Sequence, residues 1–145
     1  MSKTREVTVT FDSSSENEGF ARMVVTAFMT RLDPTLEEIA DVKTAVSEAV
    51  TNAIIHGYGD CEGQIQMKCR VQGNVLYLEI SDDGVGIEDI EKAMEPLYTT
   101  KPEFERSGMG FAFMEAFMDD LDVISSPGKG TIVQMKKTIY SALNI

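Results

Sequence analysis

Apolar and polar residues alternate in several short stretches of this chain, a pattern typical of β-strands with one buried face. In "EVTVTF" (residues 6–11), Val7, Val9 and Phe11 fall on one side of the predicted strand. Four further strands are predicted, of which the first two are joined by a hairpin turn at "QGN": residues 65–71, 75–81, 122–125 and 131–137.

Helix start signals stand at two places between the first two predicted strands. Ser13 and Glu16 have the S-x-x-E spacing of a capping box, and Thr35 and Glu38 repeat it. The helix that begins after Thr35 is predicted to end at Gly57, because glycine is a common residue at helix C-termini.

A short helical piece is predicted after "DDGVGI", and a long helix at about residues 109–119. The resulting order, β-α-α-β-β-α-β-β, predicts an α+β two-layer sandwich. In this fold, helices cover one face of a mixed, mostly antiparallel sheet. We expect residues 1–145 to form a single domain, since this length is sufficient for its own core.

Composition narrows the possible partners. The formal charge is −11, from 24 acidic and 13 basic residues, which argues against direct binding to nucleic acid but is compatible with a basic protein partner or with divalent cations. The chain contains no apolar run of the roughly 20 residues that span a bilayer, and "MSKTREVTVTF" lacks the apolar part of a secretory signal. We therefore expect a cytoplasmic protein without membrane contact. Cys61 and Cys69 are predicted to lie too far apart for a disulfide.

An unusual polar line runs along the second predicted helix in "SEAVTNAIIHGY". Glu48, Asn52 and His56 recur every four residues. At roughly 100° per residue they border the apolar sector of the helix, so they belong at the rim of the core. An amide oxygen such as that of Asn52 suits a hard cation like Mg²⁺, and a carboxylate one turn earlier suits a general base. A solvated helix edge is the alternative interpretation.

A second group of candidate residues follows the strand in "VLYLEISDDGVGI". Asp82 continues the apolar strand face of Leu76, Leu78 and Ile80. A carboxylate in such a place needs a hydrogen-bond donor, and the exocyclic amine of an adenine is one. Gly84 and Gly86 would let a ligand approach the backbone closely, although D-G sequences also form ordinary turns. Thr131, at the start of the last strand, is a candidate to assist Asp82 or is simply a β-former.

The third candidate segment is the loop "TTKPEFERSGMGF". Gly108 and Gly110 stand where this loop enters a helix, whose N-terminus favours phosphate. Lys101 and Arg106 precede them as possible phosphate ligands. An ordinary charged surface loop remains the alternative, and neither a Walker A loop nor a dinucleotide-binding fingerprint is present.

The order of these segments resembles the GHKL ATPase and kinase superfamily. Glu48 and Asn52 match its N box, "DDGVGI" its G1 box, "SGMG" its lid and G2 box, and "GKGT" the strand with the adenine-side threonine. The resemblance implies an ATP-binding α+β sandwich that uses ATP or ADP with Mg²⁺.

Longer segments are similar to the anti-sigma F family of spore-forming bacteria, most specifically in "TTKPEFERSGMGF". The resemblance implies that Glu48 is the catalytic base, that Asn52 binds Mg²⁺, and that Asp82 and Thr131 read adenine in a pocket shaped by Gly84 and Gly86. It also implies that residues of the lid enclose the phosphates: Thr99, Lys101, Arg106, Ser107, Gly108, Met109 and Gly110.

The family's partners complete the expectation. The resemblance implies a homodimer that binds a sporulation sigma factor, with Arg22 in "GFARM" touching partners, and that phosphorylates an anti-anti-sigma protein on serine. Two alternatives stay open: an ATP-dependent module that holds sigma without transferring phosphate, and a related general-stress anti-sigma kinase. A complete histidine kinase is disfavoured, because the chain's single histidine lies inside the N box.

Overall fold

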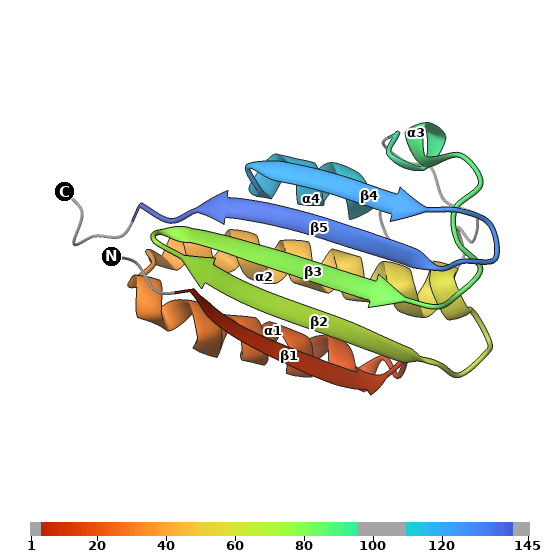
Figure 1. The fold of residues 1–145 in the computed structure, drawn as a ribbon, viewed down its shortest axis with the longest axis horizontal. Coiled ribbons are helices and arrows are strands. Elements are labelled where there is room, and N and C mark those ends of the chain that lie inside the picture. The colour runs from red at the N-terminus through yellow and green to blue at the C-terminus, as the bar shows by residue number, and fades with distance from the viewer. Residues whose placement is uncertain (1–3, 96–109, 141–145) are drawn as a thin grey trace.

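The backbone of this protein forms one five-stranded sheet with helices on one of its faces. The computed structural model describes residues 4–95 and 110–140. The strands are ordered β1-β2-β3-β5-β4, and every pair of neighbours in this order is antiparallel (Figure 1). Their bounds are as follows: β1 (Arg5–Asp12), β2 (Gln64–Gln72), β3 (Val75–Asp82), β4 (Asp120–Ser125) and β5 (Thr131–Thr138).

The helical layer is centred on α2, which packs between α1 and α4. Two of the helical segments continue directly from an α-helix: η1 is a 3₁₀ turn after α1, and η2 is a π-helical turn after α2. The bounds are as follows: α1 (Glu16–Met29), η1 (Thr30–Leu32), α2 (Leu36–Asn52), η2 (Ala53–Tyr58), α3 (Ile90–Ala93) and α4 (Gly110–Phe117).

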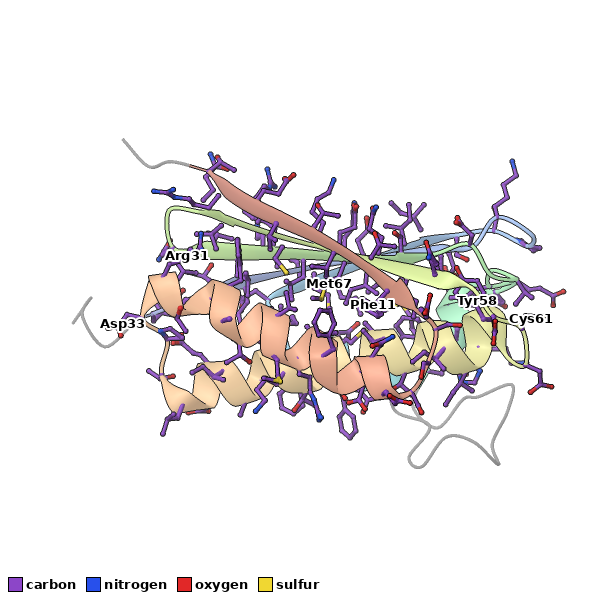
Figure 2. The ribbon with its side chains drawn as sticks, turned by 90° about the horizontal axis from the view of Figure 1, so that it is seen from below. Phe11, Arg31, Asp33, Tyr58, Cys61 and Met67 are labelled. Atoms are coloured by element: carbon purple, nitrogen blue, oxygen red, sulfur yellow. The ribbon has the colours of Figure 1, made fainter. Side chains whose placement is uncertain are left out.

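The core fills the space between the sheet and the helices. Figure 2 shows the sheet edge-on, with Phe11 and Met67 between the two layers, and both are buried. Along β3, Leu76, Leu78 and Ile80 are buried while the residues between them are only partly so. Each fully buried side chain of this size stabilises the fold by roughly 1.5–3 kcal/mol. The period-two pattern therefore sets which face of β3 the helices cover.

Of the two predicted capping boxes, the structure contains one and lacks the other. The capping box of Thr35 and Glu38 is confirmed, with the Thr35 Oγ1 accepting from the Glu38 N–H at 3.1 Å and the Glu38 carboxylate accepting from the Thr35 N–H at 2.9 Å. The box predicted at Ser13 is wrong, because α1 follows Ser15 without a side-chain cap. Ser13 instead accepts a hydrogen bond from the Gly63 N–H at 3.1 Å, which ties the end of β1 to the start of β2.

The predicted end of the second helix is also corrected. The chain does not stop at Gly57 but continues as η2 to Tyr58, and the residue that follows, Gly59, has a φ of 61°. A positive φ favours glycine, which explains why the helical segment ends there. The glycine signal was real but lay two residues later than predicted.

The α+β sandwich with helices on one face is confirmed. The sheet is more regular than predicted, since its pairings are all antiparallel rather than mixed. Cys61 is exposed and Cys69 buried, and both are free thiols. Within residues 4–95 and 110–140, no helix is both long and apolar enough to cross a membrane.

Candidate functional site

A cavity of about 790 Å³ opens at one end of the sandwich. Its walls come from the end of α2, from η2, from the facing ends of β3 and β5, and from α3 and the start of α4. These elements meet at the same end of the molecule in Figure 1. The volume lies within the range of about 300–1,000 Å³ that is usual for small-molecule sites. The cavity is therefore large enough for a nucleotide-sized ligand.

A buried carboxylate stands in the wall of this cavity. Asp82 is 8% exposed, and its Cα pairs with those of Ile65 and Thr131 on the two neighbouring strands. Its Oδ1 accepts a hydrogen bond from the Gly84 N–H at 2.9 Å. Burial raises the pKa of the Asp82 carboxyl above its ordinary value of 3.8, the Gly84 hydrogen bond lowers it, and the charge of Asp83 raises it. Its oxygens remain available to a further donor inside the cavity, because a carboxylate accepts about four hydrogen bonds.

The two glycines of "DDGVGI" allow close contacts with two other chain segments. A Cβ on Gly84 would lie 2.1 Å from the Gly57 carbonyl oxygen, so this loop packs directly on the end of η2. Gly86 has a φ of 79°, and a Cβ there would lie 2.0 Å from the Ser126 carbonyl oxygen. Gly86 lines the cavity, whereas Gly84 is not among the described residues that do so. Gly84 therefore contributes indirectly, because its lack of a side chain lets the loop pack closely against η2.

Thr131 lies beside Asp82, as predicted, and is 7% exposed. Its partner is Ser125, which no sequence motif predicted and whose Oγ lies 2.8 Å from the Thr131 Oγ1. Ser125 also donates to the Gly130 carbonyl at 2.7 Å and accepts from the Ile87 N–H at 2.8 Å. Since a serine hydroxyl has one proton, this arrangement makes Thr131 the donor to Ser125.

A sequence signal for Ser125 did exist. The turn "SPGKG" joins two predicted strands, and the hairpin pairs Ser125 with Thr131 across it. A residue directly opposite a candidate on a neighbouring strand is a candidate itself.

Only part of the polar line of the second helix faces the cavity. Asn52 and His56 line it, while Glu48, one turn before Asn52, is not among the described lining residues. All three are partly buried, which fits the predicted place at the rim of the core. The π-helical turn changes the helical phase after Asn52, so the simple 100° wheel holds for Glu48 and Asn52 but not for His56.

The remaining predicted residues lie elsewhere or outside the described part. Gly110 begins α4 and lines the cavity, which brings this helix N-terminus to the predicted phosphate side. Arg22 lies on α1, 43% exposed, with its guanidinium 3.4 Å from the Glu18 carboxylate. The other lid candidates lie outside the described residues: Thr99, Lys101, Arg106, Ser107, Gly108 and Met109.

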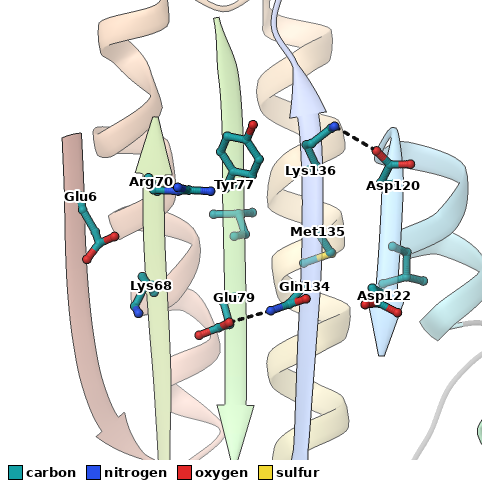
Figure 3. A pocket seen from close by; sticks show the side chains of 12 residues that line it. Glu6, Lys68, Arg70, Tyr77, Glu79, Asp120, Asp122, Gln134, Met135 and Lys136 are labelled. Atoms are coloured by element: carbon teal, nitrogen blue, oxygen red, sulfur yellow. Dashed lines mark hydrogen bonds and ion pairs between the residues drawn. The ribbon is translucent and has the colours of Figure 1, made fainter. Parts of the chain in front are cut away.

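A second hollow, of about 650 Å³, lies on the face of the sheet that the helices leave open (Figure 3). Charged side chains from every strand line it, among them Lys68 and Glu79. Many of them contact one another: the Gln134 Nε2 donates to Glu79 at 2.9 Å, and Lys136 lies 3.4 Å from Asp120. No sequence motif points to this face.

Comparison with known proteins adds independent support for the arrangement. The family model described as "Histidine kinase-like ATPase domain" matches residues 11–137. A search of solved structures finds the RsbU and RsbW domains of Rv1364c from Mycobacterium tuberculosis, with a TM-score of 0.68 and 19% identity. That match covers 93% of this chain and 32% of the longer one, and at this identity it supports the fold alone.

Curated relatives are much more similar in sequence. A protein from Thermoanaerobacter sp. (strain X514), named "Anti-sigma F factor", is 59% identical over 141 residues, which cover 97% of this chain and 99% of that protein. Proteins with the same name from Pasteuria penetrans and Bacillus velezensis are 50% and 52% identical, over 99% and 91% of this chain. The family model's match over residues 11–137 includes every described residue that lines the cavity.

Proposed function

This chain belongs to the histidine kinase-like ATPase family, among relatives named anti-sigma F factor, and from that premise we propose that it is an ATP-dependent anti-sigma factor and serine-protein kinase. The observation that carries the proposal is the buried Asp82 carboxylate in the wall of a nucleotide-sized cavity, between Thr131 and the glycine loop. Its substrates are ATP and a serine of an anti-anti-sigma protein, and its binding partner is a sigma factor resembling sigma F.

Adenine is read by the Asp82 end of the cavity. Asp82 accepts a hydrogen bond from the exocyclic amine, which supplies the donor that a buried carboxylate requires. Thr131 donates its hydroxyl proton to Ser125 at 2.8 Å, so its oxygen lone pairs remain available as acceptors on the same side. Ile80 and Val133 line the same cavity and are buried, so they give the base an apolar surface.

Asn52 suits the Mg²⁺ that the family implies. Its side chain lines the cavity on the α2 side and offers a neutral oxygen, the kind of ligand that hard cations accept. The ion commonly keeps few protein ligands and is held largely by substrate phosphates. When bound, Mg²⁺ would neutralise phosphate charge. The N-terminus of α4, beginning at Gly110, adds a favourable dipole for the phosphates.

Glu48 is assigned as the general base of phosphoryl transfer. It lies one helical turn from Asn52, outside the cavity wall, where an incoming protein serine rather than the nucleotide would meet it. As the serine Oγ forms its bond to the γ-phosphorus, the bond between that phosphorus and ADP breaks and the serine proton passes to Glu48. Such transfer depends mostly on positioning and charge, so losing the base should leave nucleotide binding intact.

The partner surface is assigned to α1. The Arg22 side chain is 43% exposed there, and the apolar residues Phe20 and Met23 near it in the sequence are 47% and 73% exposed. An exposed arginine among apolar side chains is a common composition for the centre of a protein interface. We assign sigma binding and homodimer formation to this N-terminal region. A sigma-binding role also implies work in the cytoplasm.

The decisive test measures transfer of radiolabelled phosphate to an anti-anti-sigma protein, together with sigma pull-down. Glu48→Gln is expected to lower transfer by about 10²-fold or more while ATP affinity and sigma capture persist. Glu37→Gln, at an exposed position of the same helix, is the matched control and should transfer normally.

Three results would change the proposal. Transfer by Glu48→Gln at the wild-type rate would remove Glu48 as the base. If the wild type transfers no phosphate yet captures sigma only with ATP present, the protein is a sequestering module without kinase activity. Capture of a general-stress sigma factor in preference to a sporulation one would favour the stress-kinase alternative.

A further inference from the structure

We propose that Tyr58 is a positioning residue for adenine selectivity, because its hydroxyl fixes the peptide that directly follows Asp82. The inference rests on the proposed function, since it concerns how the carboxylate is aimed at the base. Tyr58 is the last residue of η2 and lies at the cavity end of the molecule (Figure 2). No motif in the sequence analysis singled it out.

The Tyr58 hydroxyl joins two strands that are not joined by any turn at this end. It donates to the Gln64 carbonyl at the start of β2, at 2.5 Å, and accepts from the Asp83 N–H just after the end of β3, at 2.8 Å. One phenol group therefore bonds the backbone at the start of β2 and the first peptide beyond β3. A phenylalanine cannot replace either bond.

The same loop is held a second time by η2. The Val85 N–H donates to the Gly57 carbonyl at 2.9 Å, so Gly57 and Tyr58 hold both Asp83 and Val85. Asp82 and Gly84 are the direct chain neighbours of these residues, whose N–H groups are held by η2. The Asp82 carboxylate also packs against the Gly57 Cα, where an added Cβ would lie 2.9 Å from its Oδ1.

These contacts limit how the Asp82 carboxylate can turn. Its backbone is fixed by strand pairing on one side and by the Tyr58 hydroxyl on the other, and its Oδ1 is bound to the Gly84 N–H. A hydrogen bond to a ligand weakens steeply when its geometry deviates. Loosening the peptide after Asp82 should therefore weaken the hydrogen bond by which Asp82 distinguishes adenine from purines without the exocyclic amine.

The chain accommodates the Tyr58 ring through Gly63, the residue just before β2. A Cβ on Gly63 would lie 2.2 Å from the Tyr58 Cε1, so any larger residue there must displace the ring. Gly63 does not have a positive φ, so its backbone conformation is open to alanine. Gly63→Ala thus moves the hydroxyl without altering Tyr58 itself.

The experiment compares the affinities of ATP and purine riboside 5′-triphosphate, which lacks the exocyclic amine. We expect wild type to prefer ATP. In Tyr58→Phe this preference should fall by roughly three- to tenfold, the effect of one hydrogen bond, while the affinity for the amine-free analogue stays unchanged. Gly63→Ala should reproduce the loss. Tyr77→Phe removes the same atom on the open face of the sheet and should keep the wild-type preference.

The possible results separate adenine reading by Asp82 from the positioning role of Tyr58. If wild type binds both nucleotides equally, adenine reading by Asp82 fails, and the role of Tyr58 fails with it. If wild type discriminates and both variants keep its preference, only the inference about Tyr58 is overturned. Equal weakening of both nucleotides in Tyr58→Phe would also overturn it, because a general loss of packing would not single out the amine.

Discussion

The two hollows of this protein are similar in size but opposite in character. The end cavity measures about 790 Å³ and the hollow on the open sheet face about 650 Å³. In the first, the buried Asp82 receives a backbone hydrogen bond and contacts a glycine-lined loop. In the second, half-buried charges such as Glu79 and Lys136 contact side chains on the neighbouring strands. The contrast shows that volume alone does not identify a site.

The two hollows differ in how fully water solvates their charged groups. On the open face, Arg70 stacks over the Tyr77 ring at 4.2 Å, and solvent completes the hydration of each charge. Exposed pairs of this kind contribute little, about 0–1 kcal/mol. Asp82 has lost most of its contacts with water, and hydrogen bonds from the protein replace only some of them. A hydrogen bond from a ligand amine therefore stabilises Asp82 more than it would stabilise a charge that water already solvates.

The strongest test of this contrast replaces one carboxylate by an amide on each face of β3. Asp82→Asn keeps the shape of the side chain and its acceptor for Gly84, but it presents an amide donor or a weaker acceptor to the adenine amine. ATP affinity should fall by roughly 10- to 100-fold, the range for a hydrogen bond to a charged group. Calorimetric titration with ATP measures the change.

Glu79→Gln is the matched control on the open face of the same strand. It should bind ATP as the wild type does. Equal losses in the two variants would mean that the charge of β3, and not its buried end, governs nucleotide binding.

A smaller effect is expected from filling the space at the glycine loop. Gly84→Ala would place a Cβ 2.1 Å from the Gly57 carbonyl oxygen, and such overpacking typically costs about 1–3 kcal/mol of unfolding free energy. Gly19→Ala lies within α1, near its N-terminal end, and its Cβ would meet the Arg22 side chain at an ordinary 3.6 Å, so this variant should instead be more stable by about 0.5–1 kcal/mol. Urea unfolding of both variants measures the pair. A neutral Gly84→Ala would show that the loop does not need to contact η2 closely.

The smallest effect concerns pH, and its sign follows from the raised pKa of Asp82. The folded protein holds this proton more tightly than the unfolded chain, whose aspartate titrates near 3.8. The contribution is therefore complete below that value and is lost as pH rises through the folded pKa. Relative to Asp82→Asn, the wild type should lose stability as pH rises above about 4 and through the raised pKa of the folded state. A constant difference between the two unfolding curves would contradict the raised pKa.

Much of the fold was predictable because its hydrophobic periods are regular. The alternation in β3 and the capping box of Thr35 and Glu38 both appear in the structure as local patterns suggested. The capping box at Ser13 failed because a long-range partner, the Gly63 N–H, takes that hydroxyl. The end of α2 was misplaced because the π-helical turn depends on contacts with the β3 loop, which local propensity does not contain.

The site was predictable where a residue type and its strand face agreed. Asp82 and Thr131 were found because each continues an apolar face, and strand pairing brings them together. Ser125 and Tyr58 were missed because their importance lies in hydrogen bonds to the backbone of distant residues. Such bonds depend on tertiary geometry, and a hydroxyl in the sequence gives no sign of which carbonyl or N–H it will meet.

The π-helical turn limits where the chain can change length. Residues in a π-helix close i→i+5 bonds, so one residue fewer between Ala53 and Tyr58 would restore α-helical closure and rotate the tyrosine away from Asp83. The exposed residues 60–62 carry no such constraint. Insertions and deletions among related chains should therefore collect just after Gly59, while the spacing from Asn52 to Tyr58 stays invariant.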